Sequence, residues 1–212
     1  MYLPNHFEET RVEVLHDLIR HYPLGALITL TPRGLDANHL PFEVGPEPAP
    51  FGTLRGHVAR ANPVWREPSG DALVIFHGPD TYISPSWYPT KQDTGKVVPT
   101  WNYAVVRAHG VPRFIDDRAW LRAFVEKLTT RHEARRPEPW KVTDAPADYI
   151  DTQVGAIIGL EIPIARLIGK WKVSQNRPGQ DRAGVVEGLG REAPRSGAAM
   201  ADLVRDAGNG SL

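Results

Sequence analysis

The sequence has no cysteine, no net charge and no long apolar run, and each absence removes a class of protein. Without a cysteine among its 212 residues, the chain cannot form disulfides, thiolate metal sites or cysteine nucleophiles. The 25 basic residues are balanced by 25 acidic ones, which gives no support for a nucleic-acid-binding surface. No stretch reaches the ~18 apolar residues of a membrane span, and the N-terminus MYLPNHFEETR has no apolar signal-peptide core. We therefore expect a soluble, cytoplasmic protein with no membrane partner.

Familiar catalytic and metal-binding motifs are also missing. The eight histidines show no HExxH or other compact ligand spacing, so we predict no metal site. Ser84 and Ser86 lie outside any GxSxG pattern, which argues against a hydrolase. There is no GxGxxG or Walker loop for a dinucleotide or nucleotide phosphate. Because these motifs are absent, no catalytic residue can be identified from them.

The sequence is instead rich in turn residues, with 20 prolines and 19 glycines. Because only two long helical patterns occur, and neither lies between the middle strands, we expect a mainly β protein with flanking helices (α+β), built as an antiparallel barrel. Helices are predicted at 12–22 with Thr10 as N-cap, at 146–153, and after residue 117 with Asp116 or Asp117 as N-cap. Strands are predicted at 24–30, 35–44, 52–59, 71–77, 81–84, 97–115 and 156–172, with breaks at 78–79, 110–112 and 163.

A change of composition divides the chain near its C-terminal end. From Ser174 onward the composition changes to Gly, Ala, Arg and Asp, and the sequence ends in GNGSL. We expect one barrel domain with its flanking helices over residues 1–177. Residues 178–212 are expected to form a C-terminal helical extension and a flexible tail.

The segment RGHVARANP, from Arg55 to Pro63, closes a predicted strand. Alternate side chains of a strand share a face, so Arg55 and His57 are expected to point the same way. Arg60 and Asn62 follow in the turn, where charged donors and backbone N–H groups can hold a phosphate. A solvated turn with surface ion pairs is the alternative interpretation.

Aromatic and polar residues are mixed in two nearby segments, YISPSWY at 82–88 and PTWNY at 99–103. Aromatic side chains offer rigid apolar area, and the polar groups between them need hydrogen-bond partners if they are buried. This mixture suits the ring of a bound cofactor or an oligomer interface. For each aromatic residue taken singly, ordinary barrel core is the alternative.

A third polar segment, GKWKVSQNR at 169–177, ends the last predicted strand. Alternation places Lys170 and Lys172 on one face and Trp171 on the other. A polar cluster from Gln175 to Arg177 follows directly. The segment either brings further anion donors to a site or protects a strand edge against aggregation with lysines.

Five segments together resemble the PaiB-type family, the FMN-binding negative transcriptional regulators. The resemblance runs in order from residue 1 to about residue 177. Its motifs are MYLPNHF at 1–7, GHVARANPVW at 56–65, GPDTYISPSWYPTK at 78–91, VPTWNY at 98–103 and GKWKVSQNR at 169–177.

The resemblance implies a split β-barrel of the flavin-reductase and pyridoxamine-phosphate-oxidase type. Such barrels usually form homodimers that hold FMN at the subunit interface. The strand-end motif then implies FMN contacts at His57, Ala59, Arg60 and Asn62. The resemblance assigns the flavin more loosely to Tyr82, Ser84, Trp101 and Asn102, and it has Lys170, Gln175, Asn176 and Arg177 completing the site from either subunit.

Two functions remain open from these residues. The resemblance implies an FMN-binding, negative transcriptional regulator or a flavin-linked sensor. The alternative is an FMN-dependent oxidoreductase or flavin reductase with a nicotinamide donor, since bound flavin carries its own chemistry. Direct DNA binding has weaker support: no helix-turn-helix pair is visible, and the basic run RHEARRPEPWK at 131–141 also carries Glu133 and Glu138, which favours a solvated loop.

Overall fold

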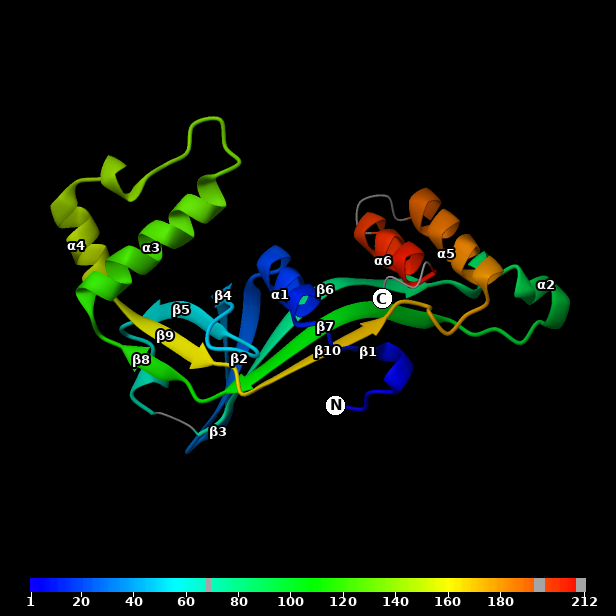
Figure 1. Cartoon of the computed structure of the whole chain (residues 1–212), viewed down its shortest axis with the longest axis horizontal. Coiled ribbons are helices and arrows are strands. Elements are labelled where there is room, and N and C mark those ends of the chain that lie inside the picture. The colour runs from blue at the N-terminus through cyan, green and yellow to red at the C-terminus, as the bar shows by residue number, and fades with distance from the viewer. Residues whose placement is uncertain (68–69, 193–196, 209–212) are drawn as a thin grey trace. The chain divides into compact units, whose positions relative to one another are not determined.

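The computed structural model describes residues 1–67, 70–192 and 197–208, which divide into two compact units (Figure 1). Unit 1 comprises residues 1–22, 76–107 and 167–212, and unit 2 comprises residues 23–75 and 108–166. Unit 1 holds η1 (Asn5–Phe7), β1 (Glu8–Glu9), α1 (Val12–His21), η3 (Pro85–Trp87), α2 (Thr90–Thr94), α5 (Gly179–Glu192), α6 (Ala198–Gly208) and the larger parts of β6 (Ala72–Ile83), β7 (Thr100–Gly110) and β10 (Arg166–Lys172). Unit 2 holds β2 (Leu24–Thr31), β3 (Gly34–Pro41), β4 (Glu43–Gly45), β5 (Thr53–Ala59), η2 (Pro63–Trp65), β8 (Arg113–Ile115), α3 (Arg118–Glu133), η4 (Val142–Asp144), α4 (Ala147–Gly155) and β9 (Ile157–Pro163).

The strands of the described residues form two sheets. One has six strands in the order β1-β10-β7-β6-β2-β3, and the other has four in the order β4-β5-β9-β8. The paired strands run antiparallel: Glu8 lies opposite Lys170 in β1 and β10, and His57 lies opposite Gly159 in β5 and β9. The prediction of a mainly β, antiparallel fold with flanking helices is confirmed.

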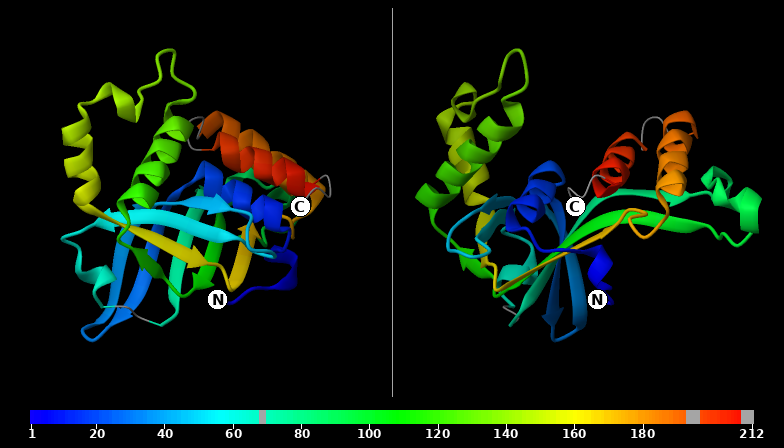
Figure 2. Two further views of the ribbon diagram at one scale, coloured as in Figure 1. Left: turned by 60° about the vertical axis from the view of Figure 1, so that its left-hand side comes forward. Right: turned by 45° about the vertical axis from the view of Figure 1, so that its right-hand side comes forward.

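In unit 1, the helices α1, α5 and α6 lie on one side of the β6, β7 and β10 strands (Figures 1 and 2). Glycines allow this close packing. A Cβ at Gly169 of β10 would lie 2.3 Å from Leu15 of α1, and one at Gly188 of α5 would lie 2.4 Å from the Trp87 ring. Alternate residues of a strand share a face, so Gly169 and Trp171 face α1 while Lys170 and Lys172 face the opposite side.

In unit 2, the helices α3 and α4 lie over β9 (Figure 1). Their buried side chains form one apolar cluster that includes Leu121, Ile150 and Val154. A Cβ at Gly159 of β9 would lie 2.4 Å from the Trp120 ring, so the glycine permits α3 to lie close to the strand. Asp117 caps α3 by accepting a hydrogen bond from the Trp120 N–H at 2.8 Å, as predicted.

The predicted strands differ from the observed ones mainly at their breaks. The predicted break at 78–79 is wrong, because β6 runs unbroken from Ala72 to Ile83. Gly78 fits there because a Cβ would lie 2.8 Å from Leu18 and 3.3 Å from the Ala104 carbonyl oxygen. The breaks predicted at 110–112 and 163 are confirmed, because they separate β7 from β8 and β9 from β10. The predicted strand 35–44 divides into β3 and β4.

Two expectations at the chain ends have different outcomes. The N-cap of α1 is Arg11 and makes no side-chain cap hydrogen bond, so the prediction of Thr10 is wrong. The expected C-terminal helices are present as α5 and α6, whereas residues 209–212 of the expected tail lie outside the described residues. The domain boundary at residue 177 stays a prediction. Within the described ranges, no helix has both the length and the apolar character needed to cross a membrane.

Candidate functional site

The predicted site residues fall into two groups, one in each unit. His57, Ala59, Arg60 and Asn62 belong to unit 2, at the end of β5 and in the turn after it. The other group belongs to unit 1: Tyr82, Ser84, Trp101, Asn102, Lys170, Gln175, Asn176 and Arg177. Each group is therefore described within its own unit.

Arg60 forms a two-point ion pair with Asp116 in unit 2. Its Nη1 and Nη2 donate to the two carboxylate oxygens at 2.7 and 2.6 Å, and its Nε donates to the Gly155 carbonyl oxygen at 2.7 Å. The hydrogen bonds to Asp116 raise the pKa of Arg60, and the same contact holds the pKa of Asp116 below its usual value. The guanidinium charge is thus compensated within the chain, and a phosphate here would have to displace Asp116.

Asn62 and His57, which also belong to the strand-end motif, contact other residues of unit 2. The Asn62 Oδ1 caps η2 by accepting from the Val64 N–H at 3.0 Å, and its Nδ2 donates to Asn38 at 2.7 Å. Ala59 is exposed. The His57 ring lies edge-on to Phe124 with 6.0 Å between ring centroids, and burial lowers its pKa. This segment mainly ties β5 to its neighbours.

Lys170 is nearly buried in unit 1, with 7% of its surface exposed. Its Nζ donates to the Tyr2 carbonyl oxygen at 3.1 Å. The same ammonium lies 5.4 Å from the ring centroid of Tyr103 and 5.9 Å from that of Tyr2. Two aromatic faces and one carbonyl therefore hold this charge without neutralising it.

Lys172 stands two residues further along the same face of β10. Its Nζ donates to the Trp101 carbonyl oxygen at 2.6 Å and to the Thr100 hydroxyl. Burial lowers the pKa of Lys172, and the nearby charges of Lys170 and Arg177 lower it further. In the part of the chain that the structure describes, none of these three cations has a salt bridge to a carboxylate. The chemistry of this donor set fits a phosphate.

Exposed aromatic rings lie on the same face as these lysines. Trp101 and Tyr103 are two residues apart on β7 and share a face, and the ammonium of Lys170 lies over the Tyr103 ring. Tyr82 lies edge-on to Trp101 with ring centroids 6.3 Å apart, and the two residues are 47% and 51% exposed. The Trp101 Nε1 donates to Asp80 at 2.9 Å, which fixes the indole. The unit 1 group could thus hold a phosphate together with a planar ring, as FMN requires.

The remaining predicted residues of unit 1 are used differently. The Asn102 amide is buried and donates to the Ser174 hydroxyl at 2.9 Å. Ser84 caps η3. The Gln175 Oε1 accepts a hydrogen bond from the Val173 N–H, and its Nε2 donates to the Trp171 carbonyl oxygen. Asn176 is exposed. The hydrogen bonds of Asn102, Ser84 and Gln175 thus stabilise the segments in which they lie.

The expected flavin contacts did not include Lys172 and Tyr103, although both residues lie in segments that the sequence analysis singled out. Strand alternation placed Lys172 on the face of Lys170, so that signal was present. The pairing of β10 with β7, which brings Tyr103 under Lys170, has no local sequence signal.

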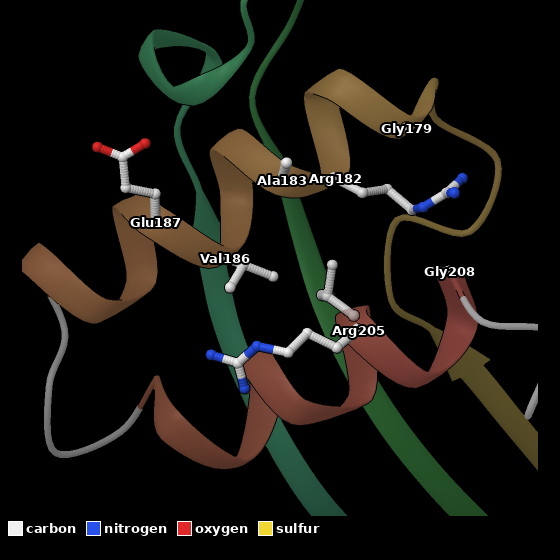
Figure 3. A pocket seen from close by; sticks show the side chains of 8 residues that line it. Gly179, Arg182, Ala183, Val186, Glu187, Arg205 and Gly208 are labelled. Atoms are coloured by element: carbon white, nitrogen blue, oxygen red, sulfur yellow. The ribbon is translucent and has the colours of Figure 1, made fainter.

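A separate groove of about 430 Å³ lies between α5 and α6 (Figure 3). Its charged residues mostly have partners within the chain: Arg205 pairs with Asp202, and Arg182 donates to the Arg177 carbonyl oxygen at 2.8 Å. Glu187 lies 3.6 Å from Arg191. Among the described residues, no motif residue lines this groove, and it offers no group of uncompensated cations like Lys170, Lys172 and Arg177.

The antiparallel sheets place the chain in the fold class of split-barrel proteins, whose solved neighbours include flavin-binding proteins. The FAD and heme binding protein of Mycobacterium smegmatis has a similar fold, with a TM-score of 0.58 at 17% sequence identity. The match covers 78% of this chain and 73% of that chain. The split-barrel prediction is confirmed.

The chain belongs to the family whose model is described as "Putative FMN-binding domain", which matches residues 1–166. Protease synthase and sporulation protein PAI 2 of Bacillus subtilis is 30% identical over 211 residues, covering 97% of both chains. An uncharacterized protein of Emericella nidulans is 36% identical over 245 residues, covering 98% of both. The predictions of a PaiB-like protein and of FMN as the cofactor are confirmed.

Proposed function

We propose that this chain is an FMN-dependent regulatory or sensor protein that holds the flavin in unit 1. The observation that carries the proposal is the group of Lys170, Lys172 and Arg177, which has no carboxylate salt bridge among the described residues and lies beside exposed aromatic rings. The lysines bind the phosphate of FMN, and Tyr82 and Trp101 flank the isoalloxazine ring.

The electrostatics of the cluster support this placement. Three cations close together repel one another, which is one reason why the pKa of Lys172 is lowered after burial is counted. A phosphate removes that repulsion and accepts charge-assisted hydrogen bonds, which are stronger than neutral ones. Riboflavin lacks the phosphate, so the cluster discriminates between FMN and riboflavin.

The strand-end motif gives a competing assignment. Its resemblance places Arg60 and Asn62 on the flavin, with His57 and Ala59 beside them, and that assignment stays a prediction. In our proposal Arg60 instead stabilises the turn after β5, because Asp116 already takes both of its terminal nitrogens. The two assignments differ in which arginine or lysine meets the phosphate.

We further propose a homodimer that covers the open face of unit 1. Tyr2 is 85% exposed and lies near Lys170, on the face that also carries Tyr82 and Trp101. Large exposed aromatic surfaces are typical of interaction sites. A partner subunit on this face would exclude water from the flavin.

A regulatory role has two supports. The Bacillus subtilis relative is named for protease synthesis and sporulation, processes that cells control. The basic run at 131–141 is partly compensated, since Arg131 lies 3.7 Å from Glu43 and Arg136 lies 3.0 Å from Glu133. Charge compensation of this kind weakens direct phosphate-backbone binding to DNA, so regulation through the flavin state fits better.

The alternative is an FMN-dependent oxidoreductase or flavin reductase, since bound flavin itself supplies electron or hydride transfer. The decisive experiment records the visible spectrum of the full-length chain with FMN and then adds NADH or NADPH. We expect a flavin spectrum shifted from that of free FMN, and no steady nicotinamide oxidation above a control with free FMN alone. Sustained turnover would replace the sensor role by the reductase role. A chain that takes up no FMN would overturn both.

A further inference from the structure

A cavity of unit 2 shares no lining residue with the group of Lys170, Lys172 and Arg177 in unit 1, and it is assigned to no function so far. It has a volume of about 320 Å³, within the range of small-molecule sites. It lies between α3, α4 and the end of β5, where the apolar cluster around Ile150 and Val154 forms one wall. The described residues that line it include no Asp, Glu, Lys or Arg. An occupant of this cavity would therefore be uncharged.

One polar group in this cavity lacks a partner. His57 lines the cavity, and its Nδ1 is buried without a hydrogen bond among the described residues. Buried polar atoms are almost always satisfied, so the orphaned ring nitrogen indicates a missing partner. Because the Nδ1 has almost no exposed surface, a partner in the cavity reaches it after a rotation of the His57 ring. Burial lowers the pKa of His57, which keeps the imidazole neutral near pH 7. A neutral ring favours a neutral hydrogen-bonding group over an ionised one.

The mouth of the cavity is aromatic. Trp140 and Tyr149 both line it and remain 45% and 55% exposed. Aromatic side chains offer rigid apolar area on which another ring can stack. Thr129 and Gln153 add the other polar side chains of the lining.

We propose that this cavity binds a small, uncharged aromatic molecule that carries a hydroxyl group. The aromatic part packs between the apolar wall and the Trp140 and Tyr149 rings, and the hydroxyl bonds to the Nδ1 of His57. A hydroxyl both donates and accepts, so it satisfies this nitrogen in either tautomer of the imidazole. Such a ligand would make the protein respond to a second small molecule besides FMN.

The test uses the FMN-loaded full chain and the probe 2-naphthol, with naphthalene as the matched probe that lacks the hydroxyl. Binding is measured by isothermal titration calorimetry. We expect 2-naphthol to bind roughly 3- to 10-fold more tightly than naphthalene, which is the effect of one neutral hydrogen bond. His57→Phe keeps a ring but removes the nitrogen, so it should abolish that preference. His39→Phe changes an exposed histidine of β3 and should keep it.

A second variant keeps the proposal testable if His57→Phe does not fold. Tyr149 is exposed, so Tyr149→Ala should leave the fold and FMN affinity unchanged while weakening both probes by a similar factor. The proposal is overturned if 2-naphthol does not bind, or if neither His57→Phe nor Tyr149→Ala changes its affinity. Equal affinity of the wild-type chain for the two probes would also overturn it, because the hydroxyl would then have no partner.

Discussion

Two regions of this molecule carry basic residues in motifs, and they differ in how that charge is compensated. In unit 2, Arg60 meets a carboxylate at two points, and it is about one-third exposed. In unit 1, Lys170 and Lys172 are held by carbonyl oxygens, a hydroxyl and aromatic faces. The first arrangement fixes a turn, whereas the second leaves positive charge available for an anion.

From this comparison we expect Lys170 and Lys172, rather than the motif residue Arg60, to bind the phosphate. An arginine or lysine serves an external anion only if the chain has not already neutralised it. Burial adds a second difference. The polar pair Asn102–Ser174 of unit 1 is 1% and 4% exposed, while the side chains of Arg60 and Asp116 are 35% and 53% exposed. Buried pairs should therefore matter more for stability than exposed ones.

The largest stability effect is expected from the buried pair. Asn102→Ala removes the hydrogen bond to Ser174 and leaves the hydroxyl without its partner, which should lower the free energy of unfolding by about 1–3 kcal/mol. Urea denaturation followed by circular dichroism measures this change. Asn176→Ala is the control, because this asparagine is exposed and lies two residues after Ser174. It should change the free energy of unfolding by less than about 0.5 kcal/mol. Equal effects of the two substitutions would show that the buried pair contributes nothing special.

A smaller effect is expected from the exposed pair. Asp116→Asn removes one charge of the ion pair with Arg60, and solvent and salt weaken such surface pairs. The pKa of Asp116 is lowered in the folded chain by Arg60, so its stabilisation is present above the ordinary aspartate pKa and is lost as pH falls through the lowered value. Wild type should thus be slightly more stable than Asp116→Asn near pH 7, and the two should converge in strong acid. A difference that persists in acid would contradict this linkage.

Much of the fold could be predicted from local patterns. The alternating and apolar runs located β2, β5, β7 and β9 to within a few residues, and Asp117 was a correct helix cap. The break expected at Gly78-Pro79 was wrong because the tight packing of Gly78 against Leu18 and Ala104 depends on residues distant in sequence. Local turn signals do not report such tertiary contacts.

The site was harder to predict for the same reason. The residue types were informative, since the lysines of β10 and the aromatic residues of β6 and β7 were both singled out. Their compensation was not visible, because Asp116 lies 56 residues from Arg60 and the Trp101 carbonyl lies 71 residues from Lys172. Strand pairing decides which charges meet, and no short motif encodes it.

The most direct test of the account compares FMN with riboflavin on two matched variants, Lys172→Met and Arg60→Met. Fluorescence titration gives the dissociation constant of each flavin, and the ratio compared is that of riboflavin divided by that of FMN. We predict that Lys172→Met weakens FMN binding roughly 10- to 100-fold and leaves riboflavin binding unchanged, since charge-assisted hydrogen bonds are of that size. Arg60→Met should leave the ratio at its wild-type value. A ratio that falls with Arg60→Met and not with Lys172→Met would contradict the account and place the phosphate at the strand-end motif.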